Sequence, residues 1–336
     1  MANGNLGAAK ANPNIGAARL IKSGAAKAIK SGGEGSGITR FNRISTPTNA
    51  AFSLLFILLA LICVIPLVFV TIISLSSDES IQKIGYSFLP VEWTTGAYTY
   101  LTNTGDTIGR AFLVSIGVTV IGTLIGLMLN SSMGYVLSRS TFKLKRLYTM
   151  IIFIPMLFSG GLVSSYMVNT QLLGLSNSYW ALILPITVTP FYIIILRTFF
   201  QTTVPDSIIE SAKIDGASQL LTFFRIVIPI SKPALATIGL FLSFAYWNDW
   251  FLAMLYLKSN YSHMYPLQYV LIGIERNIDF LVRNSQFFSA TMSGGRIPTE
   301  SARMALVVIV VLPIACSYPF FQKYFISGLT IGAVKG

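Results

Sequence analysis

The sequence predicts an all-α integral membrane protein, and its composition is the first support for this fold class. Hydrophobic residues make up 53% of the 336 residues and charged residues 11%, whereas a soluble globular protein carries about 25% charged residues. The mean hydropathy is +0.68, and the few charges are mostly basic, with a formal net charge of +12. A soluble domain would need more polar residues to cover its surface, so we expect most of the chain to lie in a bilayer.

Long segments without charge are the second support. No charged residue occurs between Arg43 and Asp78, between Arg110 and Arg139, or between Arg146 and Arg197. A helix needs about 20 apolar residues to cross the hydrocarbon core, so the last segment is long enough for two spans, divided by a turn at residues 174–177. The sequence thus predicts six transmembrane helices, near residues 50–75, 111–137, 148–171, 179–199, 234–257 and 304–322.

Basic residues are distributed unevenly over the connections between these spans. If the N-terminus is cytoplasmic, 17 Lys and Arg residues lie inside and 7 lie outside. Cytoplasmic loops of membrane proteins are enriched in Lys and Arg, so both termini are expected in the cytoplasm. The basic excess is explained by this topology. It does not indicate a nucleic-acid-binding protein, whose charge would cluster on one folded surface.

Composition also divides the chain into two parts. Residues 1–45 are rich in Gly, Ala, Ser and Lys without apolar periodicity, which predicts a disordered basic cytoplasmic tail. A signal peptide is the alternative, but the basic region is too long and the apolar run that follows has the length of a span. Residues 46–336 form the predicted transmembrane domain. Cys63 and Cys316 lie in apolar runs and are expected to be buried hydrophobic residues, neither a disulfide nor a metal site.

The connection between the fourth and fifth predicted spans, about residues 204–232, is expected to form a helix, a sharp bend and a second helix. Ser207 and Glu210 have the three-residue spacing of a capping box at the start of the first helix. Gly216 is suited to end that helix in a left-handed conformation, and Ser218 is suited to cap the second. A short, partly apolar helix between two spans is suited to dock into a groove of another protein.

This connection resembles the cytoplasmic loop of ATP-binding-cassette (ABC) importer permeases, in which E-A-A is followed after three residues by G and after nine more by I-x-L-P. Here Ser211 replaces the first of two alanines and Ile228 replaces the leucine. The resemblance covers about residues 45–336 and is closest to the smaller permease of maltose-type carbohydrate importers, in the branch for oligosaccharides and polysaccharide fragments. Further segments that carry it are residues 158–161, 179–185, 231–237 and 328–336.

The resemblance implies a permease subunit of an ATP-driven, binding-protein-dependent carbohydrate importer in the bacterial cell membrane. Its expected partners are a second permease subunit, two ATPase subunits and an extracytoplasmic solute-binding protein. In that family the loop forms a coupling helix that enters a cleft of the ATPase, which residues 206–216 would do here. The residues expected at this contact are Glu210, Ser211, Ala212, Asp215, Gly216, Ala217 and Arg225.

The chain itself is not expected to be an enzyme. ATP hydrolysis by a P-loop protein needs a glycine-rich loop that ends in Gly-Lys, and no Gly-Lys pair occurs in the sequence. Residues 158–161 and 292–296 imitate the other ATPase signature, but the predicted topology places the first in a span and the second in an outside loop. We therefore expect no cofactor or metal on this chain, with ATP and magnesium held by the separate ATPase.

The fifth predicted span carries aromatic, amide and carboxylate groups, the groups that bind sugars. An ionisable residue within a span is a functional-site hypothesis by default, which makes Asp249 the leading candidate. In the alternative interpretation, Trp247 and Trp250 belong to the interfacial aromatic belt, and Asp249 forms a structural pair with the partner permease. Asn130 and Tyr166 are weaker candidates and are typical of helix-packing polar groups. The candidate substrate-pathway residues are Tyr246, Trp247, Asn248, Asp249 and Trp250.

Two other functions and one further docking surface stay open. A self-contained secondary transporter is disfavoured, because the spans carry one acidic residue and no detectable inverted repeat. An ABC importer of peptides or ions shares the same coupling loop and is the second alternative. The long outside loop, residues 258–303, includes an apolar-patterned helix at 267–276 and could dock the solute-binding protein, although a lid or a packing role fits it as well.

Overall fold

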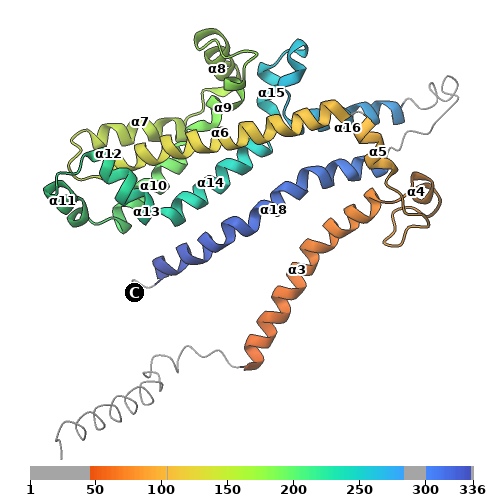
Figure 1. Ribbon diagram of the computed structural model, residues 1–336, viewed down its shortest axis with the longest axis horizontal. Helices are drawn as coiled ribbons and strands as arrows, with labels where there is room; N and C mark the ends of the chain where they lie inside the picture. Colours follow the sequence, from red (N-terminus) through yellow and green to blue (C-terminus); the bar gives the residue numbers. More distant parts are fainter. Residues whose placement is uncertain (1–45, 104, 284–299, 334–336) are drawn as a thin grey trace, which may run out of the picture. The chain divides into compact units, whose positions relative to one another are not determined.

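The computed structural model describes residues 46–103, 105–283 and 300–333 (Figure 1), and the regular secondary structure of these residues is helical. The described part contains no β-sheet, and its one isolated β-bridge joins Ser76 to Trp93. This agrees with the predicted all-α class. The predicted tail, residues 1–45, lies outside the described residues.

Contacts within the chain divide it into two units, residues 1–66 and 67–336. The described part of the first unit is the beginning of helix α3, and all other described elements belong to the second. The elements are α3 (Thr46–Ser74), α4 (Asp78–Ile84), α5 (Gly96–Asn103), α6 (Gly105–Ser138), α7 (Lys145–Leu157), α8 (Gly161–Met167), η1 (Val168–Leu172), α9 (Tyr179–Thr187), α10 (Pro190–Thr203), α11 (Asp206–Ile214), α12 (Gln219–Thr222), η2 (Phe223–Val227), α13 (Ile228–Ile230), α14 (Lys232–Trp247), α15 (Phe251–Tyr256), η3 (Ser259–Met264), α16 (Leu267–Arg283) and α18 (Glu300–Ala333).

Three of these helices are long and apolar enough to cross a membrane alone: α3, α6 and the Glu300–Pro319 part of α18. Three further candidates are bent pairs of helices. They are α7 with Gly161–Leu172, bent by 119°, α9 with α10, bent by 50°, and Gln219–Ile230 with α14, bent by 85°. The described residues therefore hold three to six candidate spans. The count of six, with its sidedness, stays a prediction.

The expectation of continuous helices over residues 148–171 and 234–257 was wrong, and the helix expected over 179–199 is also divided, at Val188 and Thr189 between α9 and α10. The first is interrupted between α7 and α8, where Gly161 has a φ of 81° that few other residues adopt. The second ends at Trp247 and resumes at Phe251 as α15. The turn predicted at residues 174–177 is confirmed, with positive φ values at both Gly174 and Asn177.

Helix α6 lies at the centre of the second unit, with α10 and α14 packed along it (Figure 1). Gly122, Gly126 and Gly134, at intervals of four and eight residues, lie on one face of α6 and allow this close approach. A Cβ atom on Gly122 would lie 2.5 Å from the Tyr246 ring of α14, and one on Gly134 would lie 3.0 Å from Leu196 Cβ of α10. Small residues at helix interfaces let backbones pack closely in membrane proteins, so this stripe sets the α6 contacts.

Asn130, in the same stripe, closes the break between α9 and α10. Its Nδ2 donates to Gly126 O at 2.6 Å and to Thr187 O at 2.7 Å, and its Oδ1 accepts from Thr189 N at 3.0 Å. Thr189 is extended, as expected for a residue before proline. Non-helical backbone at membrane depth needs such partners. Asn130 is therefore a helix-packing polar residue, which was the second of the two roles considered for it.

Cys63 and Cys316 are both free and exposed on the surface of the chain. The expectation that they are buried within the protein was therefore wrong, because they lie on apolar helices whose outer faces are open here. They do not form a disulfide with each other.

Candidate functional site

The predicted coupling loop, about residues 204–232, is built from α11, a sharp turn, α12 and the π-helical turn η2. The turn is made by Gly216, whose φ is 79°. Ala217 N donates to Ala212 O at 2.9 Å and Gly216 N to Lys213 O at 3.1 Å, which is the Schellman pattern of a helix that ends in a left-handed residue. The left-handed helix end predicted at Gly216 is confirmed. Ser218 also caps α12 as predicted, since its side chain accepts from Leu221 N at 3.3 Å.

The predicted capping box at the start of α11 was wrong. The N-cap residue is Pro205, and no side chain caps this end of the helix. Ser207 lies one residue inside the helix, where its carbonyl oxygen accepts a hydrogen bond from Ser211 Oγ at 2.9 Å. Pro205 has φ −61° and ψ 144°, the extended conformation of an N-cap residue, and its ring fixes this φ. The helix therefore begins at Asp206, two residues before the start that an N-cap at Ser207 would give, and Glu210 is left exposed.

Much of the surface of the coupling loop is apolar and exposed. Ile214, the last residue of α11, is 85% exposed, and Leu220 of α12 is 71% exposed. Ile208 and Phe224 add to this surface, while Ala212 is buried. Of the residues predicted for the ATPase contact, Glu210, Ser211, Asp215, Gly216 and Arg225 are exposed, and Ala217 is half-buried.

A charged contact that sequence analysis missed holds the loop to α6. Arg139, directly after α6, is buried, and its Nη1 lies 3.0 Å from Asp206 Oδ1 in the first turn of α11. Its Nη2 donates to Phe200 O of α10 at 3.0 Å. The sequence contains the two charges of this pair, with Arg139 at the end of a predicted span and Asp206 at the beginning of the loop. Nothing in the sequence indicated that these two connections lie together.

The candidate pathway residues fall into two groups. Tyr246 and Trp247, at the end of α14, are buried. Tyr246 Oη donates to Ile183 O at 3.0 Å, and Trp247 Nε1 donates to Val310 O at 3.3 Å. Both side chains therefore have packing roles within this chain.

The other three residues form the break between α14 and α15. Asn248 is exposed, and Asp249 and Trp250 are half-buried. Asp249 Oδ2 accepts from Leu252 N at 3.2 Å, and Asn248 Oδ1 accepts from Gln268 Nε2 of α16 at 3.3 Å. This break presents an amide, a carboxylate and an indole together at one end of α14.

The helix predicted at 267–276 is confirmed and extends further, as α16. Arg303 of α18 forms an ion pair with Asp279 of α16, and Ser301 donates to Asp78 Oδ1 of α4 at 2.8 Å. Tyr86 Oη donates to Glu300 Oε2 at 2.7 Å, and this hydrogen bond, with burial, raises the pKa of Tyr86 above its ordinary value. These contacts join α4, α16 and the start of α18.

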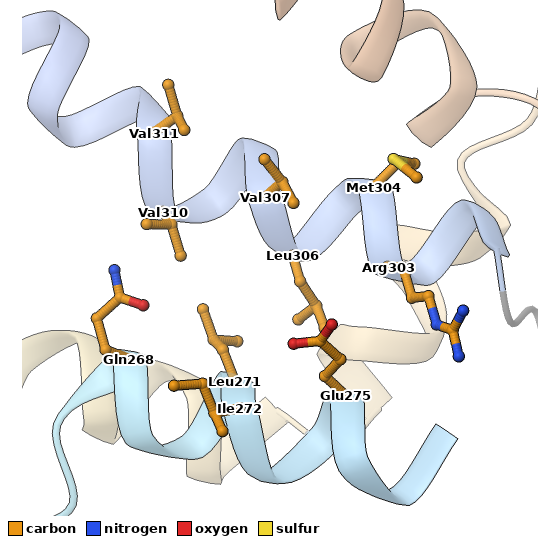
Figure 2. Close-up of a pocket in the computed structure, with 10 residues that line it drawn as sticks. All are labelled: Gln268, Leu271, Ile272, Glu275, Arg303, Met304, Leu306, Val307, Val310 and Val311. Atoms are coloured by element: carbon orange, nitrogen blue, oxygen red, sulfur yellow. The ribbon is translucent and has the colours of Figure 1, made fainter. Parts of the chain in front are cut away.

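Figure 2 shows a hollow of about 330 Å³ between α16 and α18. Aliphatic side chains from both helices face each other across it, and Glu275 and Arg303 lie at one end. No aromatic side chain lines it, so it lacks the ring faces on which sugars stack. The lining residues are Gln268, Leu271, Ile272, Glu275, Arg303, Met304, Leu306, Val307, Val310 and Val311.

Residues 119–331 match a family model described as the binding-protein-dependent transport system inner membrane component. The Bacillus subtilis (strain 168) polygalacturonan/rhamnogalacturonan transport system permease protein YtcP is 40% identical over 296 residues, 88% of this chain and 99% of the relative. The arabinooligosaccharides transport system permease protein AraQ of the same organism is 28% identical over 291 residues, 85% of this chain and 95% of the relative.

A solved structure gives the same result for the fold. It is the crystal structure of a bacterial ABC transporter involved in the import of the acidic polysaccharide alginate, and one of its chains is 28% identical to this protein. The TM-score is 0.72, with 84% of this chain and 99% of that chain covered. On the family match and the identity to its relatives, this chain belongs to the binding-protein-dependent transport system inner membrane components, the permease subunits of ABC importers.

Proposed function

We propose that this chain is the permease subunit of an ATP-driven importer of oligosaccharides or polysaccharide fragments, with six spans and both termini in the cytoplasm. Its family places it in the cell membrane and implies a second permease, an ATPase and a solute-binding protein as partners. The chain is a permease subunit and not itself an enzyme. Two ATPase subunits would bind the ATP and magnesium. A peptide or ion importer and a self-contained transporter are not favoured, because relatives are named for carbohydrates.

The observation that carries the coupling role is the apolar surface of α11 and α12. An isoleucine that is 85% exposed at the end of a helix is unfavourable in water, and burying it in a partner would recover about 1.5–3 kcal/mol. Around it, Glu210 and Asp215 are exposed and supply charge for hydrogen bonds at the rim. In this proposal ATP closes the ATPase subunits and carries α11 with them, which switches the spans between two states.

Replacing Ile214 with glutamate tests this docking surface. We expect the affinity for the ATPase subunit to fall by about tenfold to a hundredfold, the equivalent of losing most of that burial. The measurement is titration of the purified permease pair with its ATPase. Ile84→Glu is the matched control, because Ile84 is also the last residue of an exposed helix end, α4, and is 48% exposed. If both variants bind the ATPase with equal affinity, α11 is not part of the interface.

The substrate class is proposed from the carbohydrate names of the relatives, and the pathway from the break at Asn248, Asp249 and Trp250. The assay is uptake by the reconstituted complex of a labelled tripeptide and of labelled neutral and acidic oligosaccharides. We expect uptake of an oligosaccharide only. Preference for the tripeptide would contradict the carbohydrate assignment.

Asp249→Asn tests the pathway in the same assay. Asparagine keeps an oxygen that can cap α15 at Leu252 N but removes the charge. Hydrogen bonds to a charged group contribute about 1.5–3 kcal/mol, so we expect the KM for uptake to rise about tenfold. Asp106→Asn, at an exposed acidic residue in the first turn of α6, is the control. Unchanged uptake by Asp249→Asn, with intact assembly, would leave Asp249 with a structural role alone.

A further inference from the structure

Arg139 lies where three helices meet. It follows the last residue of α6, and its side chain reaches the end of α10 and the beginning of α11. Its Nη2 donates to Phe200 O at 3.0 Å, and its Nη1 lies 3.4 Å from Val204 O and 3.0 Å from Asp206 Oδ1. One guanidinium group therefore contacts the carbonyl end of one helix and the first acidic residue of the next.

The surroundings of Arg139 hold its side chain in one orientation. The residue is 8% exposed, Nε donates to Ser138 Oγ at 2.9 Å, and the guanidinium carbon lies 5.2 Å from the centre of the Tyr135 ring. Ser140 Oγ gives Asp206 a second contact, at 3.1 Å from Oδ2. A planar guanidinium with several fixed donors suits such a site, and a lysine would not reproduce it.

The Tyr135 ring, which contacts Arg139, also contacts η2, the last part of the coupling loop. It packs edge-on against Phe200 of α10, with ring centres 6.1 Å apart, and lies tilted by 37° against Phe223 of η2, with ring centres 5.2 Å apart. Five residues before Arg139, Gly134 brings α6 against α10 so closely that a Cβ atom would lie 3.1 Å from Arg197 N. The end of α6, the end of α10 and both sides of the coupling loop are thus packed as one unit.

We infer that Arg139 is a positioning residue that fastens α11 to α6 and α10, so that a displacement of α11 is passed to these two helices. The link between α10 and α11 consists of Val204 and Pro205. Without the contacts of Arg139, which we call the Arg139 clamp, rotation about the backbone of this link could let α11 move while α10 stays in place. This inference rests on the proposed function, in which α11 contacts the ATPase. It adds a residue outside the coupling loop on which transmission depends.

The test is Arg139→Gln in the complete transporter, with uptake and ATP hydrolysis measured in the same vesicles. We expect the ATPase to bind with its usual affinity and transport per ATP hydrolysed to fall at least tenfold. A role in stability alone would lower the amount of folded complex without changing this ratio. Arg146→Gln, at an exposed arginine in the first turn of α7, should behave as the wild type. A ratio within twofold of the wild type for Arg139→Gln would overturn the inference.

Two further variants keep the result interpretable. If Arg139→Gln does not assemble, Asp206→Asn removes only the ion pair at an exposed carboxylate, whose side chain is 56% exposed. It should lower the same ratio by a smaller factor, and an unchanged ratio would again overturn the inference. Arg139→Lys should rescue little, because it cannot reach both carbonyl groups and Asp206. The loss of ATPase affinity expected for Ile214→Glu tests the docking role separately. The two experiments therefore show which proposal is wrong, the positioning role of Arg139 or the docking role of α11.

Discussion

Gly216→Pro is expected to abolish transport while the spans still insert into the membrane. The φ of Gly216 is 79°, and proline is restricted to about −65°. Proline would also remove the hydrogen bond from Gly216 N to Lys213 O, which is 3.1 Å long. The preceding residue, Asp215, has φ −72° and ψ 3°, which lies outside the extended region to which a residue before proline is restricted. The turn between α11 and α12 cannot form, so the docking surface loses its shape.

The measurement is uptake at a matched amount of complex in the membrane, where less than a tenth of wild-type transport is expected. Gly174→Pro is the matched control, because Gly174 has a φ of 62°, has open space around its Cβ position and lies in another turn. Gly216→Ala should be intermediate, since a left-handed alanine costs about 1–2 kcal/mol. Normal transport by Gly216→Pro would contradict the coupling role of this turn.

Asn130→Leu is expected to produce the largest loss of stability. Asn130 is 0% exposed and supplies hydrogen bonds to Thr187 O and Thr189 N, on either side of the break between α9 and α10. Leucine has a similar volume but leaves these two backbone groups without this partner. Each orphaned buried group costs about 1–3 kcal/mol, so we expect a loss of about 3 kcal/mol or more.

Thermal unfolding of the purified complex in detergent measures this effect as a lower midpoint. Ser132→Leu is the control on the same helix, because the Ser132 hydroxyl donates to Leu129 O, 3.0 Å away within α6. Its midpoint should stay within a few degrees of the wild type. If Asn130→Leu unfolds at the same temperature as this control, the hydrogen bonds across the break do not stabilise the fold.

The turn between α11 and α12, which depends on neighbouring residues, was predicted correctly. Gly216 and Ser218 end one helix and begin the next as expected, because left-handed φ values and side-chain caps depend on the local chain. The capping box at Ser207 failed although its spacing was right, because Pro205 fixes the extended N-cap conformation two residues earlier and α11 begins at Asp206. Local patterns therefore gave the turn and its place, and the helix boundary depended on which local preference was stronger.

Roles that depend on packing were not predictable in the same way. Tyr246 belongs to the aromatic group from which the substrate pathway was predicted, yet its side chain is buried beside Gly122 and bonded to Ile183 O. The spacing of Gly122, Gly126 and Gly134 in multiples of four is a pattern typical of close helix packing. It did not indicate which helix would occupy that face.

The sequence by itself determined the all-α membrane class and the turn at Gly216 with its cap at Ser218, because apolar composition and turn chemistry act over short stretches of chain. The tertiary structure alone decided that Arg139 pairs with Asp206, 67 residues away, and that Asn130 binds Thr189, 59 residues away. Such pairs form only when helices distant in sequence pack together. The low dielectric of the interior then makes each buried polar group depend on the partner that packing provides.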